Sequence, residues 1–309
     1  VQTISAGTAL GRDRGFFGNL LGAIFGGKKT STWLVQPVGI AVTAGGRLYV
    51  ADPGVRGVHI IDPAKNEYDL LTETKYGPFV SPVGCAIDRD GRVYVSDSER
   101  GEIIVLDDDG DAEARISEGL VRPTGIQLSG DTLYVTDTGL HTILILDREG
   151  KRLGAFGARG AGASEFNYPV QLAVRDSLFV LDALNYRIQT FDRQGRFGSA
   201  FGSIGNVGGR FAAPKSIALD SDGNIYVSDG LMDNVQVFDH SGQLLLVIGR
   251  NGTRDGEFIT PSGIAIGADD TIYVVDSINR RIQIFRYREL NYICWIRFTI
   301  LVNYMKLFT

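Results

Sequence analysis

A unit of about 45 residues that recurs six times is the feature that most constrains this chain. Each unit starts at a proline followed by an apolar, strand-forming run. Successive prolines stand 45, 41, 46, 45 and 47 residues apart, at Pro37, Pro82, Pro123, Pro169, Pro214 and Pro261. A second β-rich run ends on an aspartate, a third begins six residues later, and a weaker fourth follows. This pattern predicts four short antiparallel strands in every unit.

A single four-stranded sheet of this kind cannot bury both of its apolar faces. Six sheets stacked radially bury their faces on one another, and closing the ring leaves only short edges. Glycine supplies 40 of the 309 residues, nearly double its ~7 % average, as many tight turns require. We therefore predict an all-β fold, a six-bladed β-propeller of four-stranded antiparallel blades.

Glycine-rich connectors between blades indicate how the ring closes. Three glycines and a phenylalanine recur with one spacing after blades four and five, and a version one residue longer lies near the N-terminus. The three sets are, in that order, Gly202, Gly205, Gly209 and Phe211; Gly249, Gly252, Gly256 and Phe258; and Gly7, Gly11, Gly15 and Phe17. We expect the connector phenylalanine to pack between blades. Residues 1–6 precede the N-terminal connector, where a fourth strand belongs. We therefore predict that they complete blade six and close the ring.

The repeat sets the domain boundaries. The propeller is expected to cover residues 1–287, with an insertion at 18–35 whose apolar residues recur at i, i+4 and predict a short helix packed on the propeller. Contact of that helix with a membrane or a partner is the alternative. Residues 288–309 contain no Gly and no Asp and break the repeat. We interpret them as a C-terminal tail of uncertain order, which could instead compete with residues 1–6 for the edge of blade six.

Charge and cysteine content exclude several classes of protein. Lys and Arg number 31 against 36 Asp and Glu, a net charge of −5, so no overall field attracts nucleic acid or anionic lipid. Cys85 and Cys294 cannot form a disulfide framework, and no run of about 18 apolar residues could span a membrane. We expect a monomer. Because the sequence starts at Val1 with no leader, its location is unknown, and we favour an extracytoplasmic (periplasmic or secreted) one.

Two segments carry a resemblance to a known family. Asn185 to Asp192 reads NYRIQTFD and Asn279 to Phe285 reads NRRIQIF, and with the PVGIAV-like starts and the closing aspartates they resemble the NHL repeat over about residues 1–287. Trp33 and Trp295 lie outside the repeats, which argues against a WD-repeat propeller. The resemblance implies a six-bladed propeller. It does not fix function, because such propellers serve as binding platforms, sensor domains and occasionally enzymes.

The aspartates that close the second strands could form a ring of carboxylates. An active site is needed once, whereas a cap on the turn between second and third strands is needed in every blade. We therefore interpret these six residues as structural turn caps: Asp52, Asp97, Asp137, Asp182, Asp229 and Asp276.

Positions at which the six copies differ are better candidates for binding. If the strands are sequential and antiparallel, the residues after each starting proline and those four past each aspartate share one rim around the axis. Most blades carry glycine at the third position of the first strand, but blades four and five carry a glutamine and a serine. A mixed polar and cationic rim predicts a surface that binds something anionic or polar, with ordinary solvation of loops as the alternative. The candidates are Arg56, Arg100, Arg122, His141, Gln171, Tyr186, Lys215, Ser216, Asp233 and Arg280.

These observations favour a non-catalytic recognition platform for a protein, a peptide or a small polar ligand. The alternative is a propeller enzyme, a lyase or hydrolase that uses a divalent metal in the central channel. The resemblance admits peptidyl-hydroxyglycine lyases, which hold zinc with channel histidines, but His59, His141 and His240 are not expected to converge on one ion. No residue is predicted to be catalytic or a metal ligand, and no cofactor is expected, although Ca²⁺ or another divalent ion in the channel stays open.

RNA binding through a local basic face is a third interpretation. Glu99 and Asp233 interrupt the cationic rim, and the net charge is negative, so nucleic acid is the least favoured partner.

Overall fold

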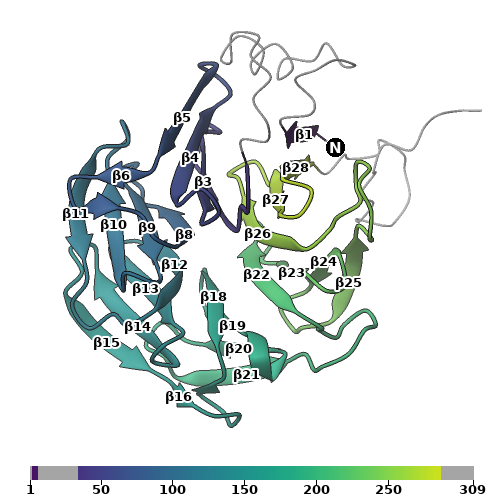
Figure 1. The fold of residues 1–309 in the computed structure, drawn as a ribbon. Helices are drawn as coiled ribbons and strands as arrows, with labels where there is room; N and C mark the ends of the chain where they lie inside the picture. The colour runs from purple at the N-terminus through teal and green to yellow at the C-terminus, as the bar shows by residue number, and fades with distance from the viewer. Residues whose placement is uncertain (1, 6–33, 287–309) are drawn as a thin grey trace, which may run out of the picture.

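The computed structural model describes residues 2–5 and 34–286 and forms a six-bladed, all-β propeller (Figure 1). Blade one contains β2 (Gly39–Val42), β3 (Leu48–Asp52), β4 (Gly57–Asp62) and β5 (Glu67–Leu71). Blade two contains β8 (Pro82–Ile87), β9 (Val93–Asp97), β10 (Glu102–Leu106) and β11 (Ala112–Ile116). Blade three contains β12 (Pro123–Ser129), β13 (Thr132–Asp137), β14 (Thr142–Asp147) and β15 (Arg152–Phe156).

The second half of the ring follows the same plan. Blade four contains β18 (Pro169–Val174), β19 (Leu178–Asp182), β20 (Arg187–Phe191) and β21 (Phe197–Phe201). Blade five contains β22 (Pro214–Leu219), β23 (Ile225–Asp229), β24 (Asn234–Phe238) and β25 (Leu244–Ile248). Blade six contains β26 (Pro261–Ile266), β27 (Ile272–Asp276), β28 (Arg281–Phe285) and β1 (Gln2–Ser5).

Short elements decorate the connections between blades. The hairpin β6 (Glu73–Thr74) and β7 (Gly77–Pro78) follows blade one. The parallel pair β16 (Ala158–Arg159) and β17 (Glu165–Phe166) lies in the connector before blade four. A one-turn 3₁₀ helix, η2 (Ala183–Asn185), follows β19.

The N-terminal strand closes the ring, as the sequence predicts. β1 pairs antiparallel with β28, with Gln2 opposite Ile284 and Ser5 opposite Arg281, and the two strands lie side by side in Figure 1. Blades six and one also meet at the axis, where the hydroxyls of Ser262 and Ser277 both donate to the carbonyl of Pro37. The last blade is therefore built from both ends of the propeller sequence.

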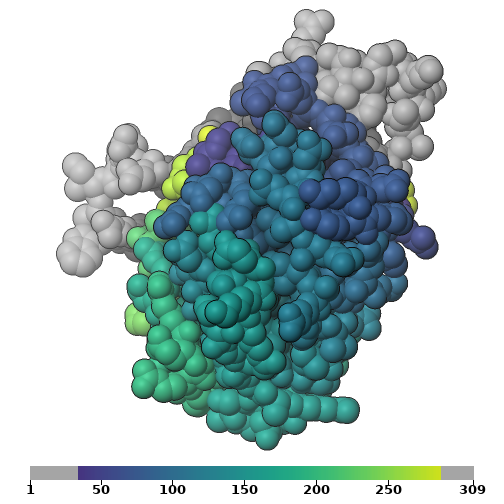
Figure 2. All heavy atoms as spheres, turned by 90° about the vertical axis from the view of Figure 1, so that its left-hand side faces the viewer, coloured from purple at the N-terminus to yellow at the C-terminus, as the bar shows by residue number. Residues whose placement is uncertain are grey.

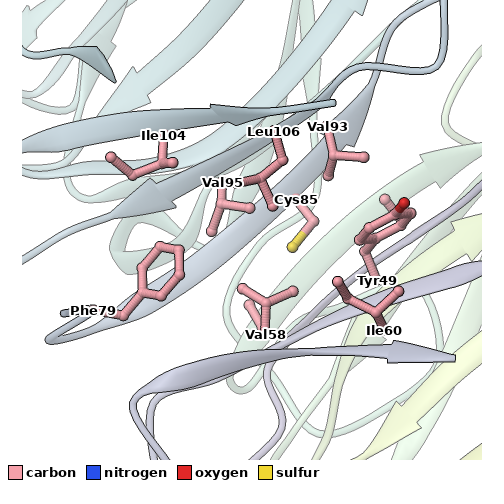
Figure 3. Packing of buried hydrophobic residues seen from close by; sticks show 11 residues of the cluster. Tyr49, Val58, Ile60, Phe79, Cys85, Val93, Val95, Ile104 and Leu106 are labelled. Carbon is pink, nitrogen blue, oxygen red and sulfur yellow. The ribbon is translucent and has the colours of Figure 1, made fainter. Parts of the chain in front are cut away.

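Apolar side chains pack between neighbouring sheets, which explains why one blade cannot fold alone. Between blades one and two, Val58 and Ile60 point toward Cys85 and Val95 of the next sheet (Figure 3). The outer strands β11 and β15 of blades two and three lie on the side of the molecule that Figure 2 shows. Every face-to-face contact of this kind removes apolar area from water, at about 25 cal/mol per Å².

The connector phenylalanines do pack between blades. Phe166, Phe211 and Phe258 are fully buried. Phe211 lies in one cluster with Ile188 of blade four and Val227 of blade five. Each ring therefore acts as a wedge between two sheets, and this sequence prediction is confirmed.

Glycine at the third position of the first strands has a steric reason. A Cβ atom on Gly39 would lie 2.1 Å from the carbonyl oxygen of Val83, and one on Gly84 would lie 2.2 Å from that of Thr124. The first strand of each blade thus runs against the backbone of the next one around the axis. Blades four and five carry Gln171 and Ser216 at this position, and the Ser216 hydroxyl accepts a hydrogen bond from the backbone N–H of Ile264 in the next blade.

Two sequence predictions concern residues outside the described part. The short helix expected within 18–35 falls almost wholly on residues that the structure does not describe, as does the tail at 288–309. Leu34, at the end of the insertion, is fully buried in the core between blades one and six. In the described residues, no helix is long and apolar enough to cross a membrane.

Candidate functional site

One end of the propeller carries the starts of the first strands and the ends of the second strands. The strand register fixes this arrangement, because Pro82 pairs with Asp97, Pro169 with Asp182 and so on around the ring. We call this end the mouth face. The rim predicted from the sequence therefore exists as one surface.

A cavity of about 320 Å³ opens at the centre of the mouth face, and we call it the mouth cavity. Its described lining contains hydroxyl groups, the carboxamides of Gln36 and Gln171, and one charged side chain, Lys215. No Asp or Glu is among its described lining residues, and Lys215 is exposed and forms no ion pair with any described residue. The polar lining residues are Gln36, Thr124, Gln171, Lys215, Ser216, Thr260, Ser262 and Ser277.

Gln171 stands at the waist of the channel. It lines both the mouth cavity and a second cavity of about 180 Å³ formed by the far ends of the first strands, the lower cavity. Its carboxamide oxygen accepts a hydrogen bond from the backbone N–H of Leu172 at 2.9 Å. A Cβ on Gly125 of blade three would lie 2.2 Å from that oxygen. The glutamine therefore occupies the space that glycine leaves open on the neighbouring blade.

Three of the ten predicted binding residues, Gln171, Lys215 and Ser216, line the mouth cavity. Ser216 is buried, and its hydroxyl accepts the backbone N–H of Ile264 at 3.2 Å, so it also links blade five to blade six. Arg56, Arg122 and Arg280 are exposed on the mouth face but do not line the cavity.

The other predicted residues are held by contacts within the protein. Arg100 pairs with Glu102 at 2.6 Å and donates to the carbonyls of the β6–β7 hairpin. Asp233 accepts from the side chain of Asn251 and from the backbone of blade six. His141 accepts a long hydrogen bond of 3.4 Å from the backbone N–H of Tyr168. Tyr186 packs against the core between blades four and five.

The position four past each aspartate has a conformational explanation. All six residues there adopt a left-handed backbone, with φ between 52° and 63°, at Arg56, Gly101, His141, Tyr186, Asp233 and Arg280. Each of them turns the chain from the second strand into the third. Variation at this position therefore reflects a turn that tolerates many residue types at some cost in strain.

The six aspartates are fully buried and hold the mouth face together. Asp229 accepts hydrogen bonds from the backbone N–H groups of Ala212 and Ala213, ahead of its blade, and from those of Leu231 and Met232 in its own turn. The other aspartates accept the same kind of bond from the connector that precedes their blade. Each carboxylate thereby fixes a connector to a turn.

The sequence interpretation missed a second set of residues that hold the connectors. In blade four, Arg187 pairs with Asp182 at 2.9 Å and donates to three carbonyls of the connector, while Gln189 donates to Glu165. Arg281 and Gln283 do the same in blade six. The Arg-Ile-Gln triplets at 187–189 and 281–283, which the family resemblance already included, could have pointed to these residues.

Blade one replaces that glutamine with His59. The imidazole is fully buried, with Nε2 3.2 Å from a carboxylate oxygen of Asp52 and Nδ1 3.1 Å from the hydroxyl of Tyr68. Burial opposes ionisation of Asp52, but the hydrogen bond from His59 and two backbone N–H groups outweigh it and lower the pKa of Asp52. His59 is thus part of the aspartate network and lies away from the two cavities.

Side chains that could bind a metal ion are not grouped together in the described residues. Between residues 34 and 286 no group of three or more His, Cys, Asp or Glu side chains is arranged to hold an ion. Cys85 lines the lower cavity, and burial raises the pKa of its thiol to about 12. The lining therefore offers neutral polar groups and one ammonium group.

Two related carboxylates lie on the end opposite the mouth face. Burial opposes ionisation of Asp88, but hydrogen bonds from Arg148 and Arg92 outweigh it and lower its pKa. Asp220 occupies the same place in blade five, and its hydrogen bonds come from neutral groups, including Asn224. Burial therefore dominates there and raises the pKa of Asp220.

Comparison with known proteins supports the class of fold. The chain is a six-bladed β-propeller, and a family model (DUF5128) described as "6-bladed beta-propeller" matches residues 218–307. No curated protein gives a significant match to the sequence.

Solved structures show the same architecture at low identity. A catalytically inactive virginiamycin B lyase from Staphylococcus aureus with quinupristin has a TM-score of 0.61 and 15 % identity, over 82 % of each chain. A gluconolactonase from Xanthomonas campestris has a TM-score of 0.62 and 20 % identity, over 81 % of this chain and 86 % of that one. A protein of unknown function from Bacteroides thetaiotaomicron has a TM-score of 0.65 and 17 % identity, over 84 % and 71 %. At these identities the likeness concerns the fold alone.

Proposed function

We propose that this protein is a non-catalytic recognition platform that binds a small polar ligand with an anionic group in the mouth cavity. The observation that carries the proposal is the lining of that cavity, in which Lys215 is the one charged side chain among the described residues and the polar remainder is hydroxyls and two carboxamides. An ammonium group that has no carboxylate partner among the described residues is suited to an anion from solution. We also propose that the blades are NHL repeats, since their RIQ residues hold the connectors.

The size of the cavity favours a small ligand. Its volume of about 320 Å³ lies at the lower end of the range for small-molecule sites, roughly 300–1,000 Å³. The glutamine at the waist gives the bound group a neutral hydrogen-bonding partner at the base of the cavity. Specificity would then come from fixed polar groups on rigid first strands.

The enzyme alternative would require a divalent metal in the channel. The similar structures include a lyase and a gluconolactonase, but their likeness is one of fold. Elemental analysis of the purified protein, with melting curves recorded with and without a chelator, tests this alternative. A stoichiometric metal whose removal lowers the melting temperature would support the enzyme over the platform.

Binding itself is tested with carboxylates as probes. We would titrate the protein with acetate, succinate, citrate and octanoate and follow binding by ligand-observed NMR. Lys215→Met is expected to weaken the best-bound probe about tenfold, because a charge-assisted hydrogen bond is lost. Lys151→Met is the matched control, since Lys151 is exposed on a turn at the opposite end of blade three. Equal binding by the Lys215→Met variant and the wild type would contradict the proposal.

A further inference from the structure

Large aliphatic side chains stand exposed on the rim of the mouth face in three consecutive blades. The position two past the closing aspartate holds Leu184 in blade four, Leu231 in blade five and Ile278 in blade six. They are 51 %, 71 % and 60 % exposed. We call these three residues the aliphatic arc. In blades one to three the same position holds Gly54, Glu99 and Gly139.

The packing of the propeller does not explain the aliphatic arc. The turn at this position is made equally well by glycine or glutamate in the first three blades, so its conformation does not require an apolar residue. Single exposed aliphatics are ordinary, but exposed aliphatics at the same position of three consecutive blades, one of which lines the mouth cavity, are a candidate interaction site. The arc is therefore a feature of one half of the rim.

The arc lies beside the charged residue of the mouth cavity. A Cβ on Gly230, next to Leu231, would lie 3.1 Å from Cε of Lys215 and 3.2 Å from the methyl group of Thr260. The lysine stem therefore lies against the turn that presents Leu231. Ile278, on the next blade, lines the cavity itself. One ammonium group and two exposed aliphatic side chains thus share the boundary between blades five and six.

We propose that the ligand of the mouth cavity is an aliphatic carboxylate, whose carboxylate pairs with Lys215 and whose hydrocarbon chain lies on the aliphatic arc. The inference rests on the proposed function and specifies its ligand class. Charge complementarity supports it, because Lys215 is the one charge in the described lining. Glu99, at the arc position of blade two, would repel a carboxylate on the opposite side. The hydrocarbon chain is expected to leave Lys215 toward Leu231 of blade five and Ile278 of blade six, with Leu184 of blade four continuing the same position of the rim.

A series of carboxylates of increasing chain length tests this ligand class. Acetate, butanoate, hexanoate and octanoate are titrated in the same buffer, with octanol as the uncharged probe. Affinity is expected to rise about two- to fourfold for each added methylene group that the arc covers. Octanol is expected to bind about tenfold more weakly than octanoate.

Variants separate the arc from the charge. Leu231→Asn and Ile278→Asn are each expected to weaken octanoate about tenfold and to leave acetate unchanged. Leu153→Asn is the matched control, because Leu153 is 58 % exposed on the outer strand β15, and it should change neither. All three substitutions lie on the surface, so the melting temperature should stay nearly constant and show that the variants are folded.

Three outcomes would overturn the inference in different ways. Affinity that depends on Lys215 but not on chain length would remove the aliphatic class and leave the anion site standing. Octanol binding as tightly as octanoate, with no effect of Lys215→Met, would remove both the ligand class and the proposed function. Tight binding of octanoate that is unaffected by Leu231→Asn and Ile278→Asn would place the hydrocarbon chain elsewhere and contradict the role of the arc.

Discussion

Replacing Asp182 with asparagine should destabilise the propeller more than the same change at Asp229. Both aspartates are fully buried and close the second strand of adjacent blades. The hydrogen bonds to Asp229 come from backbone N–H groups. Asp182, in contrast, also neutralises the guanidinium of Arg187, whose side chain is 17 % exposed.

The expected magnitudes follow from these partners. Asp229→Asn keeps one acceptor oxygen but turns an amide toward the N–H of Ala212, which leaves a buried donor unpaired at about 1–2 kcal/mol. Asp182→Asn additionally leaves the charge of Arg187 without a counter-charge. Removing one partner of a buried ion pair costs about 3–5 kcal/mol, and partial exposure of the arginine favours the lower end, about 3 kcal/mol.

Thermal melting followed by circular dichroism measures the difference. For a chain of 309 residues, 1 kcal/mol shifts the melting temperature by roughly 1.5 °C, so we expect falls of about 5 °C for Asp182→Asn and about 2 °C for Asp229→Asn. Adding Arg187→Met to Asp182→Asn should cost less than the sum of the two single losses, because both substitutions break the same ion pair. Equal losses for the two single variants would refute the reasoning, since the ion pair would then contribute nothing.

Two further perturbations test the packing and the electrostatics. Phe211→Ala should cost about 3–5 kcal/mol by opening a cavity between blades, whereas Phe197→Ala, at a ring that is 40 % exposed, should cost much less, and chemical unfolding of both variants tests this. Asp88 has a lowered pKa, so its ionised form stabilises the fold above the unfolded pKa. Asp88→Asn should therefore lose more stability at pH 7 than at pH 3. Asp220 has a raised pKa, so its contribution to the stability of the fold declines as pH rises. The loss of stability caused by Asp220→Asn should therefore be smaller at pH 7 than at pH 4, as measured by thermal melts at each pH.

Much of the fold could be predicted from the sequence because the same strand pattern recurs in six copies, so that the assignment of each strand does not depend on one segment alone. The starting prolines and closing aspartates lie opposite each other at the same end of antiparallel pairs, as with Pro214 and Asp229. One apolar strand would be weak evidence alone, but six at one spacing leave a single way to bury their faces. The closing role of the N-terminal segment was predicted from the connector that follows it, and the pairing of β1 (Gln2–Ser5) with β28 confirms it.

The candidate site was harder to predict for a physical reason. Comparing copies identifies variable positions but does not say which way each side chain points. Arg56 and Asp233 vary because a left-handed turn accepts many residues, whereas Lys215 and Gln171 vary where the first strands border the axis. The sequence alone does not tell a residue in a turn from a residue that borders the central cavity. The sequence analysis therefore assigned all four residues to one rim.

The same comparison of copies becomes informative once the geometry is known. The position two past the aspartate lies in the same turn in every blade. The fold therefore does not determine which residue type stands there, and a difference in residue type indicates another constraint. Glycine, glutamate and glycine in blades one to three and leucine, leucine and isoleucine in blades four to six divide the rim into two halves of different chemistry. Because the turn forms with either set of residues, the proposed ligand of the mouth face would account for the division, with the apolar residues on the side of Lys215.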